Sequence, residues 1–181
     1  MAFEFERQKI SDLVLIKPLL FGDNRGYFME IYKKSDFYKN GICDNFCQDN
    51  YSKSSRYVLR GLHYQEEPCS QAKLVRCVKG RIYDVVLDIR KNSETFGKYL
   101  GIELNDDNKY SLYIPKGFAH GFVVLSDEAE ILYKTSNEYN PVLEKGIIWN
   151  DTDLNIDWGI DFEPVLSNKD RALPKFKEVF N

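Results

Sequence analysis

The sequence predicts a mainly β protein, and two observations carry that prediction. From about residue 56 onward, short segments rich in β-branched and aromatic residues alternate with turn residues. Regularly spaced short strands of this kind are typical of a sandwich, a barrel or a jelly roll. The 12 tyrosines and 12 phenylalanines among 181 residues also favour the pleated, half-buried surfaces of β-sheets.

The expected strands follow one another between turn residues. They are VLRGLHYQ (58–65), AKLVRCVKG (72–80), RIYDVVLDIR (81–90), KYLGIEL (98–104), KYSLYIP (109–115), HGFVVLS (120–126) and EILYKTS (130–136). Lys79-Gly80 lies between two apolar runs and predicts a hairpin turn, whereas the segment NDDN at 105–108 predicts a longer polar turn.

Helix signals are few. Ser35 followed by DFYKNG predicts a short capped helix that ends at Gly41, and the segment SNKD from Ser167 predicts a second helix start. No internal repeat, low-complexity tract or linker divides the chain. We therefore expect a single domain over residues 1–181 with a few short peripheral helices.

Composition narrows the range of partners and locations. The net charge of −3 provides no global field that would attract nucleic acid or an acidic membrane surface. The N-terminal segment has no apolar core of a signal peptide, and no stretch approaches the roughly 18 apolar residues of a membrane span. We expect a cytoplasmic protein without nucleic-acid or membrane partners, whose four cysteines are free thiols.

The segment LRGLHYQ places a guanidinium and an imidazole within an apolar strand. Under strict alternation His63 shares a face with Gly61 and Gln65, while Arg60 lies on the opposite face. If both side chains serve one pocket, the strand must bulge, and Gly61 is the expected position because glycine within a strand often marks a bulge. Alternation likewise directs Asp84 toward either solvent or a polar cavity and does not decide between them.

Each candidate residue also has a purely structural interpretation. A histidine in an apolar strand is often a hydrogen-bonded structural residue. Lys73 can be solvated or can protect a sheet edge, and Tyr133 can be a core residue with a hydrated hydroxyl. Asp170 fits the last position of an S-x-x-D capping box that starts at Ser167.

Taken together, the motifs resemble those of the dTDP-4-dehydrorhamnose 3,5-epimerase family of the cupin superfamily. The runs that carry the resemblance are QDNYSKSSRYVLRGLHYQ, QAKLVRCVKGRIYDVVLDIR, TFGKYLGIEL, YIPKGFAHGFVVLSDEAEILYKTS and LSNKDR. The likeness extends in order from about Asp23 to Pro174. It implies a cupin jelly-roll β-sandwich.

The cupin comparison also bears on metal binding. PKGFAH from Pro115 fits the second cupin motif, whereas the first motif normally supplies H-x-H and then a glutamate seven residues before a glycine. Here Gln65 replaces the second histidine and Lys73 replaces the glutamate. An ammonium has no lone pair to donate and repels a dication. We expect no metal and no cofactor, with Lys73 in the electrophilic position.

The resemblance implies proton exchange at C3 and C5 of a 4-keto-6-deoxy hexose linked to dTDP. Both carbons are α to the C4 carbonyl, so the reaction needs a base, a group that stabilises the oxyanion, and an acid on the opposite face of the ring. By family motif, His63 is the base, Asp170 orients it, Lys73 faces the C4 oxygen and Tyr133 returns a proton. The expected substrate contacts are Arg25, Glu30, Gln48, Asn50, Arg60, Lys73, His120, Tyr139, Glu144 and Lys169.

Members of the family are homodimers that share strands, and we expect the segment FEFERQ to take part in the interface. Three alternatives stay open on the sequence. The first is an epimerase that acts at C3 or C5 only, on a related nucleotide sugar. The second is a non-catalytic sugar-binding cupin, and the third is a metal-dependent cupin oxygenase.

Overall fold

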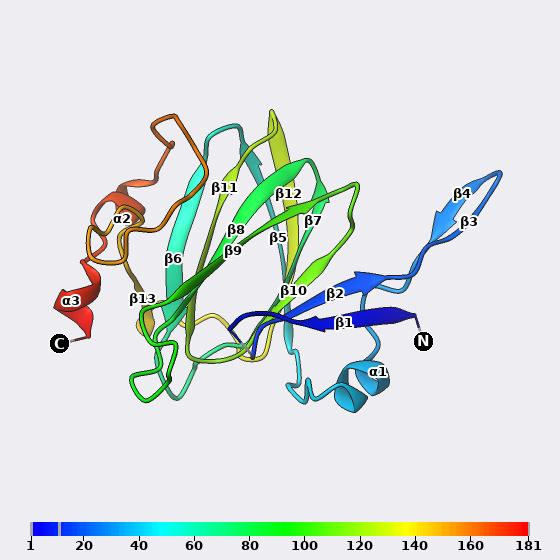
Figure 1. Cartoon of the computed structure of the whole chain (residues 1–181), viewed down its shortest axis with the longest axis horizontal. Coiled ribbons are helices and arrows are strands. Elements are labelled where there is room, and N and C mark those ends of the chain that lie inside the picture. The colour runs from blue at the N-terminus through cyan, green and yellow to red at the C-terminus, as the bar shows by residue number, and fades with distance from the viewer. Residues whose placement is uncertain (1, 11, 181) are drawn as a thin grey trace.

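Two antiparallel sheets face each other in the computed structural model, which describes residues 2–10 and 12–180 (Figure 1). The six-stranded sheet has the order β1 (Phe3–Arg7), β2 (Val14–Pro18), β10 (Ser111–Ile114), β7 (Lys73–Lys79), β12 (Glu128–Thr135) and β5 (Gln48–Ser55). The five-stranded sheet has the order β13 (Glu144–Gly146), β6 (Leu59–Gln65), β11 (Phe118–Val124), β8 (Arg81–Asp88) and β9 (Tyr99–Asn105). This β-sandwich confirms the predicted fold class.

All seven predicted strands are present, but the predicted hairpin at Lys79-Gly80 is wrong. β7 pairs with β10 and β12, whereas β8 pairs with β11 and β9 in the other sheet. The turn therefore carries the chain from one sheet to the other. Gly80 has a φ of 77°, and a Cβ atom there would lie 2.1 Å from the carbonyl oxygen of Glu128. This corner requires glycine, as a hairpin turn often does, which is why the sequence did not distinguish the two.

The short helices lie at the periphery. α1 spans Lys34–Lys39, so Ser35 lies inside the helix. The prediction that Ser35 caps this helix is therefore wrong. α2 (Asn168–Arg171) begins after Ser167 as predicted, and α3 spans Phe176–Val179. Within the described residues, no helix has the length and apolar character that a bilayer crossing requires.

Apolar side chains pack in three layers. Val75 and Ile131 of the six-stranded sheet meet Ile82 and Val86 of the five-stranded sheet in the central layer. The outer face of the five-stranded sheet is covered by the C-terminal segment, seen in orange and red beside β6 in Figure 1. The outer face of the six-stranded sheet is covered near α1, where Phe37 is buried. β8 therefore contributes apolar side chains both to the central layer and to the layer on the outer face of its sheet.

A small hairpin projects from the sandwich. It consists of β3 (Phe21–Asp23) and β4 (Gly26–Phe28), and it extends away from both sheets (Figure 1). Its aromatic side chains are largely exposed, with 56% of Phe21, 58% of Tyr27 and 65% of Phe28 accessible to solvent. We call residues 21–28 the arm.

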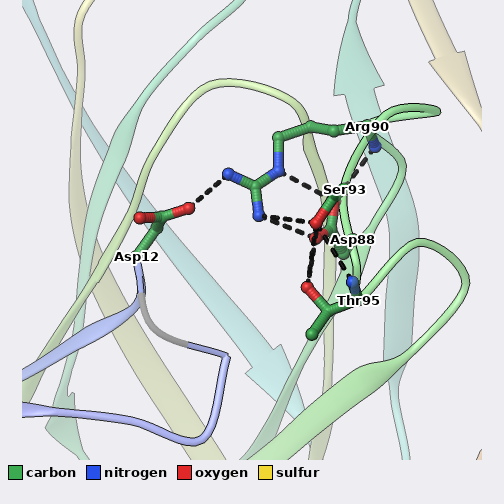
Figure 2. A network of polar contacts seen from close by, with 5 residues as sticks. All are labelled: Asp12, Asp88, Arg90, Ser93 and Thr95. Atoms are coloured by element: carbon green, nitrogen blue, oxygen red, sulfur yellow. Dashed lines mark hydrogen bonds and ion pairs between the residues drawn. The ribbon is translucent and has the colours of Figure 1, made fainter.

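A polar network holds the loop that follows β8 (Figure 2). The fully buried carboxylate of Asp88 accepts hydrogen bonds from the guanidinium of Arg90 (2.7 and 2.9 Å) and from the hydroxyls of Ser93 (2.7 Å) and Thr95 (2.6 Å). Arg90 also contacts Asp12, which connects this loop to the N-terminal strands. Burial tends to raise the pKa of Asp88, but the hydrogen bonds from Arg90, Ser93 and Thr95 outweigh it and lower the pKa to about 2.

Replacing Asp88 with asparagine is expected to lower the free energy of unfolding at pH 7 by about 2 kcal/mol, because the folded pKa lies below the ordinary value near 4. A depressed carboxyl pKa stabilises the fold above the unfolded pKa, and this contribution is lost as pH falls from about 4 toward 2. Urea unfolding from pH 7 to pH 3 measures it. Asp88→Asn should flatten the acid side of the curve, and the matched control Asp127→Asn, at an exposed ion pair with Arg56, should leave it unchanged.

Candidate active site

A cavity with two adjoining lobes lies between the two sheets. The same five side chains line both lobes: His63, Lys73, Tyr133, Tyr139 and Glu144. One lobe adds Gln48, Asn50 and Gln65 to this set, and the other adds Arg60, His120, Lys169 and Asp170. His63 lies on β6, whereas Lys73 and Tyr133 lie on β7 and β12 of the facing sheet. The predicted catalytic groups therefore approach one space from two opposite walls.

A bulge in β6 brings Arg60 and His63 to the same side. His63 pairs with His120 of β11 and Arg60 pairs with Phe122, so two residues of β6 lie opposite one residue of β11. Gly61 has a φ of 116°, and a Cβ atom there would lie 2.6 Å from the Cα atom of Gly121. Only glycine fits this close backbone contact. The structure confirms the bulge predicted at Gly61.

His63 contacts Asp170 of α2. Its Nε2 atom lies 2.6 Å from Oδ1 of Asp170, in an ion-pair contact that is not aligned as a hydrogen bond. Ser167 accepts from the backbone N–H of Asp170 (3.0 Å) and donates to its Oδ2 atom (2.7 Å). Burial tends to raise the pKa of Asp170, but the contacts with His63 and Ser167 outweigh it and hold that pKa below its usual range. Asp170 thus belongs to the helix start and also presents an ionised carboxylate to the imidazole.

Lys73 extends from β7 into the cavity. β7 is an interior strand between β10 and β12, so the alternative in which Lys73 protects a sheet edge is wrong. Burial lowers the pKa of Lys73 to about 8, although the negative charges of Asp84 and Glu144 act against this decrease. The side chain is therefore an ammonium at neutral pH that can lose its proton under mildly alkaline conditions.

Tyr133 faces the cavity from β12. Burial raises the pKa of its phenol, and the nearby charge of Arg60 only partly offsets this effect. The hydroxyl is therefore protonated at neutral pH and can donate a proton. Arg60 is held by a hydrogen bond from its Nε atom to the hydroxyl of Ser54 (3.0 Å), which leaves the two Nη groups available to a ligand.

The other binding candidates form a connected polar wall. The hydroxyl of Tyr139 donates to Glu144 (2.5 Å), and Lys169 contacts the same carboxylate. Gln48 donates to Asn50 (2.8 Å), and its carbonyl oxygen accepts from the backbone N–H of Tyr139 (2.9 Å). These contacts fix side chains from four separate chain segments around one space.

Asp84 does not itself line the cavity, but it contacts His120, which does, and the sequence left its role undecided. It is fully buried, and its Oδ2 atom lies 2.8 Å from Nε2 of His120. The alternation of side chains along the strand placed Asp84 on one face, but it could not show that this face lies next to His120. The pairing of β8 with β11, which puts Asp84 opposite Phe122, supplies that information.

Arg25 and Glu30 do not line the cavity. Arg25 lies at the turn of the arm, where its exposed guanidinium binds Asp23 (2.6 Å). Glu30 follows the arm and lies 4.0 Å from the ammonium of Lys33. These two predicted substrate contacts therefore lie apart from the cavity of their own chain, because the arm extends away from the sandwich.

Gln65 occupies the position of the second histidine of the first cupin motif. Its amide donates to the carbonyl oxygens of Cys69 (2.7 Å) and Glu138 (3.2 Å) and accepts from the backbone N–H of Asn140 (2.7 Å). It joins the loop after β6 to the loop that carries Tyr139. Across residues 2–10 and 12–180, no group of three or more His, Cys, Asp or Glu side chains is arranged to hold a metal ion.

Comparison with known proteins identifies relatives of the whole chain. Residues 7–178 match the family model described as dTDP-4-dehydrorhamnose 3,5-epimerase. A dTDP-4-dehydrorhamnose 3,5-epimerase from Shigella flexneri is 52% identical over 174 residues, which cover 96% of this chain and 96% of the relative.

Solved structures show the same fold. The crystal structure of dTDP-4-dehydrorhamnose 3,5-epimerase from Elizabethkingia anophelis has a TM-score of 0.95 at 47% identity, with 100% of both chains covered. A dTDP-6-deoxy-D-glucose-3,5-epimerase from Legionella pneumophila, in complex with dTDP-4-keto-L-rhamnose, has a TM-score of 0.94 at 42% identity. That match covers 98% of this chain and 94% of the other.

Proposed function

Because this chain belongs to the dTDP-4-dehydrorhamnose 3,5-epimerase family, we propose that it inverts C3 and C5 of dTDP-4-dehydro-6-deoxy-D-glucose to give dTDP-4-dehydro-L-rhamnose. The substrate is a dTDP-linked sugar. The observation that carries the proposal is the pair His63 and Asp170 on one wall of the cavity, opposite Lys73 and Tyr133 on the other. An α-keto epimerase needs a base and an acid on opposite faces of the sugar ring.

In this mechanism, the ring nitrogen of His63 that does not face Asp170 removes the proton from the carbon next to the C4 carbonyl. The C–H electron pair moves into a C–C double bond, and the carbonyl oxygen becomes an oxyanion. Asp170 stabilises the imidazolium that forms, because it holds an ionised carboxylate 2.6 Å from Nε2. Lys73 donates to the oxyanion as its charge develops.

Tyr133 then gives its proton to the same carbon from the opposite face, which inverts the configuration. Its raised pKa keeps the phenol protonated until it is needed. Solvent or a neighbouring group reprotonates the phenolate and removes the proton from His63. The same sequence of steps at the second carbon completes the double epimerisation.

The charged groups around the cavity are proposed to hold the nucleotide. Arg60, His120 and Lys169 line one lobe, and a diphosphate binds well to arginine and lysine side chains. The polar wall of Gln48, Asn50, Tyr139 and Glu144 supplies further contacts to the sugar and the base.

We also propose that two copies form a homodimer in which the arm of one chain reaches the cavity of the other. The exposed aromatic side chains of the arm and the distance of Arg25 and Glu30 from their own cavity support this arrangement. β1, which contains FEFER, is an edge strand and can take part in the interface. Sedimentation velocity of the parent chain and of a chain without residues 21–28 tests the dimer.

The remaining proposals concern how and where the chain works. We propose a single epimerase domain that needs neither metal nor cofactor, since Lys73 and Gln65 occupy positions of cupin metal ligands and Gln65 is bonded to backbone groups. Full occupancy by iron or manganese in elemental analysis would contradict this. A cytoplasmic location, without nucleic-acid or membrane partners, suits a nucleotide-sugar enzyme with four free cysteines.

Incubation with dTDP-4-keto-6-deoxyglucose in D2O tests the function directly. The double epimerase should introduce deuterium at both C3 and C5, as measured by proton NMR. Label at only one of the two carbons would favour the mono-epimerase alternative. The absence of label at both carbons in a folded protein would favour the non-catalytic sugar-binding alternative.

Replacing Tyr133 with phenylalanine is expected to reduce inversion more strongly than exchange. The base can return a solvent-derived proton to the original face, so deuterium still enters the substrate while the configuration is retained. Comparing the rate of deuterium incorporation with the rate of product formation measures the difference. Tyr51→Phe, on the neighbouring strand and outside the cavity, is the control. Equal losses of exchange and inversion in Tyr133→Phe would require another acid.

A further inference from the structure

Asp84 carries a buried charge that the mechanism above does not use. Its side chain is fully buried on the inner face of β8, and its Oδ2 atom contacts His120. The other oxygen, Oδ1, is buried without a hydrogen-bond partner among the described residues. A buried, partly unpaired carboxylate is costly unless nearby positive charge compensates it.

Lys73 is a cation of the cavity that can compensate the charge of Asp84. On the inner face of β8, Asp84 lies between Ile82 and Val86, which pack in the central layer with Val75, two residues from Lys73 on β7. His120, the partner of Asp84, lines the same lobe as Lys73. From this position Asp84 interacts electrostatically with Lys73, as does Glu144. Glu144 is already shared between Lys169 and Tyr139. Asp84 has no lysine or arginine partner within 4.0 Å in the described part of the chain.

The other charged and titratable groups around Lys73 do not replace Asp84. Besides Lys73, the charged and titratable groups that line the cavity come from β6, β11, β12, β13, the loop before β13 and α2: they are Arg60, His63, Tyr64, His120, Tyr133, Tyr139, Glu144, Lys169 and Asp170. Arg60 and Lys169 disfavour a second cation, and the carboxylate of Asp170 is already in contact with His63. Tyr133 is neutral, and Glu144 is partly neutralised by Lys169.

Asp84 and Lys73 do not form a direct salt bridge, and this leaves the N–H groups of Lys73 free. No carboxylate lies within 4.0 Å of the Lys73 ammonium among the described residues, so its N–H groups are not occupied by a salt bridge. A carboxylate at longer range in a poorly solvated site still favours the charged amine. The three donors of the ammonium therefore stay available to a substrate oxygen.

We infer that Asp84 is a positioning residue that holds His120 in place and keeps Lys73 protonated for its contact with the substrate oxyanion. The inference rests on the proposed role of Lys73 in epimerisation. In the absence of the Asp84 charge, burial and the cations of the cavity would favour the neutral amine, which is a weaker stabiliser of an oxyanion.

The variant Asp84→Asn tests the inference, because it preserves the shape of the side chain and its contact with His120 but removes the charge. In the parent enzyme, kcat is expected to fall as pH rises through about 8, where Lys73 loses its proton. In Asp84→Asn this fall should move to lower pH by about one unit or more. For a decrease of one unit from about 8, the variant should lose about fourfold more activity at pH 8 than at pH 6.5, with little change in KM.

A titration of Lys73 that does not depend on turnover accompanies the kinetics. The ¹³Cε resonance of Lys73, assigned by its disappearance in Lys73→Met, should titrate at lower pH in Asp84→Asn than in the parent. Asp127→Asn, which removes an exposed carboxylate outside the cavity, should leave both the kinetic profile and this titration at the parent values.

The outcomes separate the two proposals. A parent protein that does not epimerise its dTDP-sugar contradicts the proposed function, whereas the Lys73 titration still tests the effect of Asp84. If Asp84→Asn leaves the titration and the alkaline limb of kcat at their parent positions, the inference is wrong. A uniform loss of kcat at all pH values, with an unshifted titration, would assign Asp84 a purely structural role.

Discussion

Replacing His63 with alanine is expected to abolish deuterium exchange and epimerisation together. Without the imidazole, no group in the cavity removes the proton, so the enolate does not form. Loss of a general base typically costs about 10²–10⁴-fold in rate. Deuterium incorporation at C3 and C5 of dTDP-4-keto-6-deoxyglucose in D2O, followed by proton NMR, measures the effect.

The matched variant for this experiment is Asp170→Asn. It retains the imidazole but removes the negative charge 2.6 Å from Nε2, and it should therefore show a smaller loss than His63→Ala. Circular dichroism and binding of dTDP confirm that both variants are folded. If exchange persisted at one carbon in His63→Ala, a second base would have to serve that carbon.

Replacing Lys73 with methionine is expected to lower kcat by about 10²–10³-fold, the usual cost of removing one donor to a developing oxyanion. Methionine has nearly the same length and can fill the same space in the cavity wall, so the packing there is preserved. Both exchange and inversion should fall, because they share the enolate. KM for the dTDP-sugar should change much less than kcat, since the ammonium acts mainly on charge that develops during the reaction.

The control for this variant is Lys145→Met, which removes an exposed lysine from β13 outside the cavity. It should retain parent activity. A rise in KM with unchanged kcat in Lys73→Met would show that Lys73 only binds the substrate. The oxyanion would then have to be stabilised by another donor.

The strands of the sandwich were predictable from sequence because alternation and turn residues are local signals. Lys73, Val75 and Cys77 alternate along β7, and all three face the interior of the sandwich. The assignment of strands to sheets was not predictable in the same way. Lys79-Gly80 has the composition of a hairpin turn, but whether such a turn pairs its flanking strands or passes them to different sheets depends on distant pairing partners.

The candidate site was largely predictable because most of its residues belong to motifs on strands. The bulge at Gly61 followed from the requirement that Arg60 and His63 serve one pocket. The contact between Asp84 and His120 and the separation of Arg25 from the cavity could not be predicted from the sequence. Both depend on tertiary placement: the register of β8 against β11 determines the first, and the direction of the arm determines the second.

The bulge in β6 has a consequence for comparing sequences of this fold. Arg60 and His63 are three positions apart, and an unbulged strand would direct them to opposite faces. The extra residue therefore determines which side chains of β6 face the cavity and which face the outer layer. An alignment that opens a one-residue gap between the arginine and the histidine would assign the imidazole to the outer apolar layer, so R-G-L-H should be treated as one indivisible unit when distant homologues are searched for.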